Sequence, residues 1–271
     1  MNRILCSTGA LIGRPNGRDY RLLKQCAREL DCDGFEFLMY NTWHGEIEEI
    51  KSFLASLSVD FPVFHIEKSV GNLISRDGEG DVEQAFSLFE TNCAIARDIG
   101  SEKLVLHLWG SVDSDKNIAN NIECYKTLRS IADRYGLLLT VENVVCNRKD
   151  PYTHFCELMT EYHDVRFTYD TKMAEFHCQN ELLYLPESEE LFSHVAHFHI
   201  NDYAGGYMEW ERLATLNIGE GHVDFERLFG FLKEKGYKND FTVEATSFDK
   251  NGIINFAALN KSFAKIREFL D

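Results

Sequence analysis

The feature that most constrains the fold of this chain is a regular alternation between short apolar runs and longer amphipathic segments. Eight short runs, most of them rich in β-branched and aromatic side chains, predict β-strands. They cover residues 3–7, 34–38, 62–66, 103–108, 137–142, 165–170, 195–200 and 241–244. Strands that alternate with helical segments in this way are typical of parallel sheets with right-handed crossovers. The alternation therefore predicts an α/β chain built on a parallel sheet.

The segments between these strands show the spacing of amphipathic helices. Apolar residues recur at intervals of three and four in residues 19–30, 82–99, 117–135, 225–235 and 256–269. Gly100, Gly136 and Gly236 directly follow three of these segments, where a left-handed residue commonly ends a helix. We count eight helical segments and eight strands, with no surplus element and no G-x-G-x-x-G after a strand. We therefore expect a (β/α)8 TIM barrel that spans residues 1–271 as a single domain.

A formal net charge of −16 limits the partners of such a chain. An acidic surface repels phosphate backbones and anionic membranes, so we expect neither nucleic acid nor a membrane as a partner. No apolar run is long enough to span a bilayer, and the N-terminal MNRILCSTGALIG lacks the apolar stretch and cleavage site of a signal peptide. The eight cysteines are scattered without a C-x-x-C pair, which is typical of reduced thiols. We expect a cytoplasmic protein.

Candidate metal ligands gather at the C-terminal ends of the predicted strands, where TIM barrels place their active sites. Four successive strands end with Glu142, Asp170, His199 and Glu244 at or near their last residue. A carboxylate is costly to bury at such a position unless it is paired or bound to a cation. Three carboxylates and one imidazole form a hard ligand set that suits Mn²⁺, Mg²⁺, Co²⁺ or Fe²⁺ and also accepts Zn²⁺. We therefore expect one divalent metal ion as the cofactor.

The segments around these four residues resemble a known family. They are TVEN at Glu142, YDTK at Asp170, HFHIND at His199, and NIGEGHVDFERLFGFLKEKGY leading into TVEAT at Glu244. Nearly the whole chain is similar to the xylose-isomerase-like TIM barrels of the sugar phosphate isomerase/epimerase group. That group includes tagatose and psicose 3-epimerases, inosose isomerase and dehydratase, and endonuclease IV.

The resemblance implies a role for each of these residues. Glu142, Asp170, His199 and Glu244 would bind one divalent metal, and Glu142 and Glu244 would also be catalytic. One glutamate would remove a proton from carbon and the other would return one on the opposite face, through an enediolate held on the metal. The implied protein is a metal-dependent isomerase or epimerase of carbohydrate metabolism, with manganese as the expected metal. Its substrate would be a small sugar, a sugar phosphate or a cyclic polyol ketone. Related barrels often form homo-oligomers, although no segment here identifies an interface.

Two departures from the family pattern leave alternatives open. Met173 stands three residues after Asp170, where many members carry a histidine, which makes Lys172 a candidate cation for a phosphate or an oxyanion. His65 and His107 match positions that help to hold a second metal in endonuclease IV, so they are candidates for a second metal or for substrate contact. The further Asp-x-His pair of that enzyme does not occur in YAGGYMEWERLATLN, which disfavours DNA repair.

Weaker candidates complete the predicted site. Glu36, Trp109 and His222 join Lys172 as substrate-binding candidates, although Glu36 fits equally well a carboxylate that pairs with a cation inside the barrel mouth. Five cationic side chains in the loops could also bind a phosphate group of the substrate, and the sequence does not choose among them. They are Arg14, Arg18, Lys68, Arg76 and Arg148. The alternative functions are a dehydratase of the inosose dehydratase type, a binuclear metal-dependent phosphoester hydrolase, and a non-catalytic sugar-binding barrel.

Overall fold

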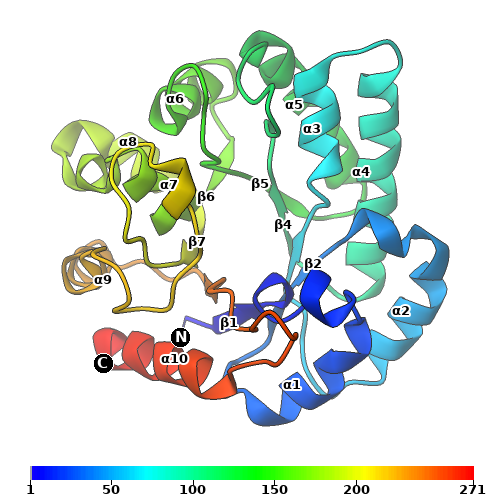
Figure 1. Ribbon diagram of the computed structural model, residues 1–271. Coiled ribbons are helices and arrows are strands. Elements are labelled where there is room, and N and C mark those ends of the chain that lie inside the picture. Colours follow the sequence, from blue (N-terminus) through cyan, green and yellow to red (C-terminus); the bar gives the residue numbers. More distant parts are fainter. Residues whose placement is uncertain (1) are drawn as a thin grey trace.

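The computed structural model describes residues 2–271 and shows a closed barrel of eight parallel strands (Figure 1). In chain order the strands are β1 (Ile4–Ser7), β2 (Phe35–Leu38), β3 (Val63–His65), β4 (Lys103–Leu106), β5 (Leu138–Glu142), β6 (Arg166–Asp170), β7 (Val195–Ile200) and β8 (Phe241–Val243). Each strand pairs with its neighbours in the sequence, and β8 closes the barrel on β1 with Phe241 opposite Ile4. The predicted TIM barrel is confirmed.

Ten α-helices surround or cap the barrel in the described part of the chain. Eight form the outer layer: α1 (Leu23–Glu29), α2 (Ile47–Ala55), α4 (Asp81–Asp98), α5 (Ile118–Arg134), α6 (Pro151–Glu161), α8 (Glu189–His194), α9 (Phe225–Glu234) and α10 (Phe256–Leu270). The other two are α3 (Ser69–Arg76) and α7 (Thr171–Phe176). The expectation of eight helices without a surplus is therefore wrong, because the chain after β3 and after β6 folds into a short helix before the outer one.

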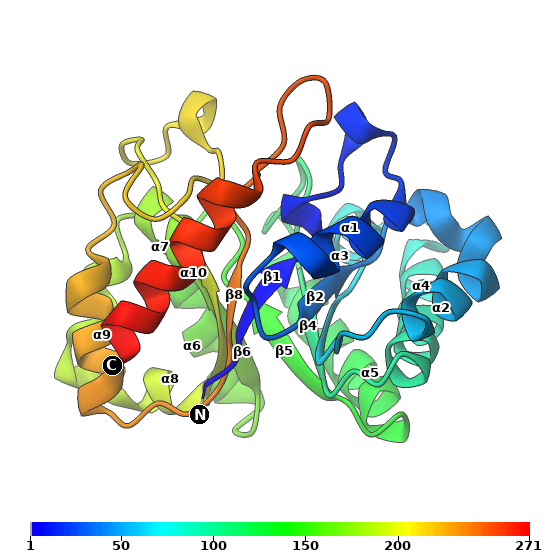
Figure 2. The same cartoon turned by 90° about the horizontal axis from the view of Figure 1, so that it is seen from below.

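The loops on the two ends of the barrel differ in length. The loops after β1, β7 and β8 project from the same end, which is where the strands finish (Figure 2). They contain most of the short 3₁₀ segments, which are Thr8–Ala10, Arg14–Asn16, Tyr20–Leu22, Asn41–Glu46, Asn180–Tyr184, Pro186–Ser188 and Trp210–Arg212. At the other end, tight connections follow α4, α5 and α9, where Gly100, Gly136 and Gly236 have φ of 82°, 71° and 65°, as expected.

The interior of the barrel changes from apolar to polar along its axis. Alternate residues of a strand point to the same face, so residues two apart share the barrel interior. Leu5, Val63 and Val105 form a small buried cluster that is separate from the main core. Two residues further along the chain, toward the loops, lie the polar residues Ser7 and His65 at the ends of β1 and β3, and His107 just after β4. The main core fills the space between the strands and the outer helices, so the inward polar residues are free for other roles.

Two further findings concern the chain as a whole. All eight cysteines are free thiols. Among residues 2–271, no helix has both the length and the apolar character needed to cross a membrane.

Candidate metal centre

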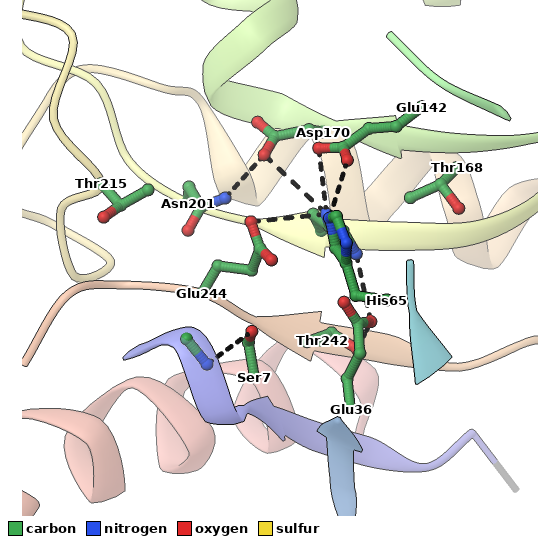
Figure 3. A network of polar contacts seen from close by, with 12 residues as sticks. Ser7, Glu36, His65, Glu142, Thr168, Asp170, Asn201, Thr215, Thr242 and Glu244 are labelled. Atoms are coloured by element: carbon green, nitrogen blue, oxygen red, sulfur yellow. Dashed lines mark hydrogen bonds and ion pairs between the residues drawn. The ribbon is translucent and has the colours of Figure 1, made fainter. Parts of the chain in front are cut away.

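Four side chains from adjacent strands converge at the C-terminal end of the barrel (Figure 3). Glu142 and Asp170 end β5 and β6, His199 lies on β7, and Glu244 directly follows β8. His199 Nδ1 lies 3.2 Å from Glu142 Oε1, 3.4 Å from Glu244 Oε2 and 4.0 Å from Asp170 Oδ2. One ligand atom from each residue lies within 4.8 Å of the other three. The structure thus brings together the four predicted ligands, which we refer to as the quartet.

The quartet is accessible from one side. The side chains of Glu142, Asp170 and His199 are at most 1% exposed, whereas that of Glu244 keeps 16% of its surface exposed. A ligand that reaches the quartet therefore approaches past Glu244.

The geometry and charge of the quartet fit a divalent metal ion. An octahedral ion with ligands at about 2.1 Å places neighbouring ligand atoms about 3 Å apart and opposite ones about 4 Å apart. The distances from His199 Nδ1, which run from 3.2 to 4.0 Å, match this range. Burial alone would lower the pKa of His199, but the charges of Glu244, Glu36 and Glu142 outweigh it and raise that pKa well above its ordinary value. So concentrated a negative charge favours a compensating positive charge, which a protonated His199 or a bound cation can supply.

Glu36 on β2 orients the central histidine of the quartet. Its Oε2 accepts a hydrogen bond from His199 Nε2 at 3.1 Å, which leaves Nδ1 directed toward the three carboxylates. The same oxygen lies 3.1 Å from His197 Nε2 and accepts from the Thr242 hydroxyl at 2.9 Å. Burial would raise the pKa of Glu36, but the charge of His199 and the hydrogen bonds of both histidines hold it well below its usual range. A carboxylate on the second nitrogen of a metal-binding histidine is a common arrangement.

This position bears on the two interpretations of Glu36. The residue is fully buried on the inner side of His199, and its Oε2 is engaged by three protein groups. These contacts favour pairing with a positively charged group inside the barrel, and a role of Glu36 in substrate binding stays a prediction.

Three residues fix the orientation of Asp170. Asn201 Nδ2 donates to Asp170 Oδ2 at 2.9 Å, and the Met173 N–H donates to Oδ1 at 2.8 Å, which caps the start of α7. The side chain of Asn143 accepts from the Asp170 N–H at 2.6 Å and donates to its carbonyl at 3.0 Å. Met173, which replaces the usual family histidine, thus supports the quartet through its main chain.

Lys172 lies close enough to the quartet to act on it electrostatically. Burial and the charges of Glu142 and Glu244 raise the pKa of Asp170 to about 6, and the charge of Lys172 opposes this rise. Lys172 is 6% exposed, and its ammonium group has no carboxylate within 4.0 Å among residues 2–271. Its predicted contact with an anionic part of a substrate stays a prediction.

A second group of ligand atoms shares Glu142. His107 Nε2 lies 2.7 Å and His65 Nε2 lies 3.4 Å from Glu142 Oε2, but neither is aligned for a hydrogen bond, so this buried oxygen has no donor. His65 Nδ1 donates to the Ile66 carbonyl at 2.9 Å, and its Nε2 is the nitrogen that faces Glu142. Burial lowers the pKa of His107 to about 4. Two imidazoles and a carboxylate are suitable ligands for a second ion.

The other two substrate-binding candidates differ in position. Trp109 is fully buried and donates its indole N–H to the Val144 carbonyl at 3.0 Å, and its predicted substrate contact stays a prediction. Its ring packs edge-on against His154 in the wall of the barrel. His222 is half exposed, with Nε2 3.4 Å from Glu175 Oε1 on α7. It belongs to the loop surface, and a role in substrate binding stays a prediction.

Asp202 organises the glycine-rich IGEG segment. Its carboxylate accepts hydrogen bonds from the main-chain N–H groups of Gly219, Gly221 and Val223 at 2.8, 2.9 and 3.0 Å. Gly219 has a left-handed φ of 89°, and Gly221 packs so closely on the main chain of Tyr203 that no side chain would fit. The position of Asp202 just after a strand predicts that it orients the loop after β7, with a simple turn as the alternative. These three hydrogen bonds agree with the first interpretation.

Fold and site together define a TIM barrel with a candidate metal centre at the C-terminal end of its strands. The model of the xylose isomerase-like TIM barrel family matches residues 25–269. The chain belongs to that family.

Solved structures share the fold at low sequence identity. A D-tagatose 3-epimerase-like protein is 20% identical with a TM-score of 0.74, over 99% of this chain and 97% of that one. A D-allulose 3-epimerase from Methylomonas sp., in complex with D-allulose, is 15% identical with a TM-score of 0.70, over 98% and 96% of the two chains. An IOLI protein with a binding zinc atom is 14% identical with a TM-score of 0.73, over 99% and 98%. No curated protein sequence matches the chain. At these identities the similarity establishes the fold.

Proposed function

We propose that this protein is a divalent-metal-dependent isomerase or epimerase of a small sugar, a sugar phosphate or a cyclic polyol ketone. The observation that carries the proposal is the convergence of Glu142, Asp170, His199 and Glu244 on one point at the mouth of the barrel. Membership of the xylose isomerase-like family supports it, as do structural neighbours that include a D-allulose 3-epimerase and a zinc-containing protein. We expect manganese as the metal, with Mg²⁺, Co²⁺ and Zn²⁺ as alternatives, and a cytoplasmic location.

The two glutamates of the quartet are the proposed catalytic residues. Glu142 Oε1 and Glu244 Oε2 lie 3.2 and 3.4 Å from the same nitrogen of His199 but come from β5 and from the end of β8. Two carboxylates that reach one substrate from different sides can remove a proton from carbon and return one elsewhere without a diffusing base. A bound divalent ion would polarise the substrate oxygens and stabilise the negative charge that develops on them. Asp170 and His199 would complete the ligand set of the ion. Asn201 and Glu36 fix the orientation of these two side chains through hydrogen bonds.

A second candidate function is a binuclear metal-dependent phosphoester hydrolase. It is favoured by one observation, the approach of His65 and His107 to the unsatisfied Oε2 of Glu142. In that function the two ions would flank a phosphoryl group instead of a ketone. The number of bound ions separates the two candidates.

The first test is the metal content of protein purified without chelator. We expect about one equivalent per chain, lost or weakened in Glu244→Gln and retained in Glu226→Gln, which changes an exposed glutamate on α9. Ketoses and inososes are then incubated with the loaded protein in D₂O, and deuterium is expected at the carbon next to the carbonyl. Two equivalents of metal would favour the hydrolase, and a product lighter by one water would indicate a dehydratase. No metal after reconstitution would leave a sugar-binding barrel as the better description.

A further inference from the structure

A separate cavity opens beside the quartet at the same end of the barrel. It has a volume of about 200 Å³ and is bounded by the loop after β1, the loop after β2 and the start of α3. Its charged and aromatic lining comes from Arg18, Tyr40, Glu67 and Lys68. Of the five loop cations that the sequence left open, only Arg18 and Lys68 line this cavity.

The two cations in this lining have no acidic partner. Neither the Arg18 guanidinium nor the Lys68 ammonium lies within 4.0 Å of a carboxylate oxygen of residues 2–271. Arg18 Nε is buried and donates to no acceptor. A buried donor on a charged group is costly to leave without an acceptor, and in a chain with a net charge of −16 acidic partners are plentiful. Two cations that line one cavity without an acidic partner therefore point to an anionic ligand.

The backbone and an aromatic ring hold Arg18 in this position. Its φ of 53° is left-handed, which is strained for a residue other than glycine and is found most often at functional sites. Trp43 Nε1 donates to the Arg18 carbonyl at 3.0 Å. The guanidinium lies 4.6 Å from the centre of the Tyr40 ring, and the Tyr40 hydroxyl is itself fixed by a 2.6 Å hydrogen bond to the Ile12 carbonyl. The cation is thus positioned before any ligand arrives.

The acidic residue in the lining, Glu67, is satisfied by other groups. It accepts hydrogen bonds from Asn92 Nδ2 at 2.9 Å and from the Ser69 hydroxyl, and it lies 2.7 Å from His44 Nε2. Its side chain is 1% exposed. Glu67 therefore shapes the cavity wall without neutralising Arg18 or Lys68.

The cavity adjoins the metal centre through the ends of β3 and β4. The Met39 N–H, in the cavity lining, donates to the His65 carbonyl at 3.1 Å. Gly71, in the first turn of α3, packs directly on the His107 carbonyl and leaves no room for a side chain there. His65 and His107 are the two histidines that face Glu142 of the quartet. The cavity and the quartet therefore both border the chain segments that carry His65 and His107.

We propose that this cavity binds the phosphate group of a phosphorylated sugar whose carbonyl end lies at the quartet. The proposal rests on the function proposed above and narrows its substrate class from sugars in general to sugar phosphates. A phosphate ester carries a charge of about −1.5 to −2 near neutral pH and three acceptor oxygens, which matches one forked guanidinium and one ammonium. The N-terminal end of α3, which begins at Ser69 in the cavity lining, adds a favourable dipole.

The test measures binding separately from turnover. Inorganic phosphate is titrated calorimetrically into the full chain after metal removal, so that phosphate cannot bind through the metal. We expect saturable binding that weakens roughly tenfold or more in Arg18→Gln and in Lys68→Gln, which corresponds to about 1.4 kcal/mol. Lys126→Gln, which changes an exposed and unpaired lysine on α5, is the matched control and is expected to bind like the wild type. Lys68 is exposed, so its substitution should not disturb folding.

A second arm uses the metal-loaded protein and a matched pair of substrates, a free ketohexose and its 6-phosphate. We expect the phosphate ester to be preferred in kcat/KM, with the preference reduced in Arg18→Gln and Lys68→Gln but not in Lys126→Gln. Phosphate affinity that is unchanged in both cavity variants would overturn the inference, as would acetate that binds more tightly than phosphate. Turnover of free ketoses without phosphate binding would overturn it while sparing the proposed function. Phosphate binding without turnover of any ketose would support the phosphate site and contradict the proposed isomerase function.

Discussion

Two buried clusters in this molecule contain the same kinds of ligand and differ in how their oxygens are satisfied. In the quartet, and equally in the group of Asp115, Cys146 and His154, one ligand atom per residue lies within 4.8 Å of the others. Asp115, however, accepts hydrogen bonds from the main-chain N–H groups of residues 147, 148 and 149 at 2.8 to 2.9 Å. Its Oδ2 also lies 3.0 Å from His154 Nε2.

The rest of the Asp115 cluster is equally well satisfied. His154 Nδ1 lies 2.7 Å from Glu157 Oε2, and burial raises the pKa of the Cys146 thiol, which keeps it protonated and a poor ligand. In the quartet three carboxylates surround one imidazole nitrogen, and Glu142 Oε2 accepts no aligned hydrogen bond among residues 2–271. Proximity of ligand types therefore does not by itself indicate a metal site. An excess of buried carboxylates over the donors that face them is the better criterion.

The largest expected effect that tests this comparison comes from Asp170→Asn. The substitution keeps the size of the side chain and removes one negative charge from the quartet. We expect the affinity for Mn²⁺ to fall by more than about 100-fold, since even residues that only support a ligand cost 10- to 100-fold. Affinity is measured by competition with a chelator. Asp115→Asn, the matched control, is expected to keep the wild-type affinity. Loss of metal in Asp115→Asn but not in Asp170→Asn would show that the Asp115 cluster, and not the quartet, binds the metal.

A smaller effect is expected for Glu36→Gln, which changes the carboxylate beneath the quartet. Glutamine fills the same space but lacks the charge that holds the Nε2 proton of His199 and leaves Nδ1 for the metal. We expect a 10- to 100-fold loss of metal affinity and a mixed His199 tautomer, seen in the imidazole ¹⁵N resonances. Unchanged affinity together with an unchanged tautomer would show that Glu36 only fills space.

The sequence predicted the parts of the molecule that follow from local pattern. The strands were found because β-branched and aromatic residues concentrate in them, and the quartet because each member lies at or within one residue of the end of its strand. Alternation along a strand then places Glu142 and Asp170 inside the barrel. The family resemblance added the roles of these residues.

What the sequence missed depends on contacts between distant segments. Helices α3 and α7 are short, and they lie in the chain after β3 and after β6, where α3 packs against the segment after β4. Trp109 has the same aromatic character in a pocket wall as in the core, and its bond to Val144 depends on a segment 35 residues away. The donors to Asp115 lie more than thirty residues away, which no spacing rule anticipates.

The smallest expected effect is on stability, in Asp115→Asn. The substitution leaves the main-chain N–H groups after β5 with a weaker acceptor and removes the charge beside His154. We expect the free energy of unfolding to fall by about 1–2 kcal/mol at pH 7, measured by urea denaturation, with metal affinity unchanged. A stability equal to that of the wild type would mean that Asp115 does not anchor this loop.

The pH dependence of that difference identifies its cause. Burial would raise the pKa of Asp115, but the hydrogen bonds of His154 and of the three main-chain N–H groups outweigh it and lower the pKa to about 2. An aspartate in an unfolded chain has a pKa of about 3.9. Because the folded pKa is the lower one, the stabilisation is complete well above pH 4 and is lost as the pH falls toward 2. The stability gap between wild type and Asp115→Asn should therefore narrow over that window. If the difference in the free energy of unfolding stays constant with pH, the loop is held by the shape of the Asp115 side chain and not by its charge.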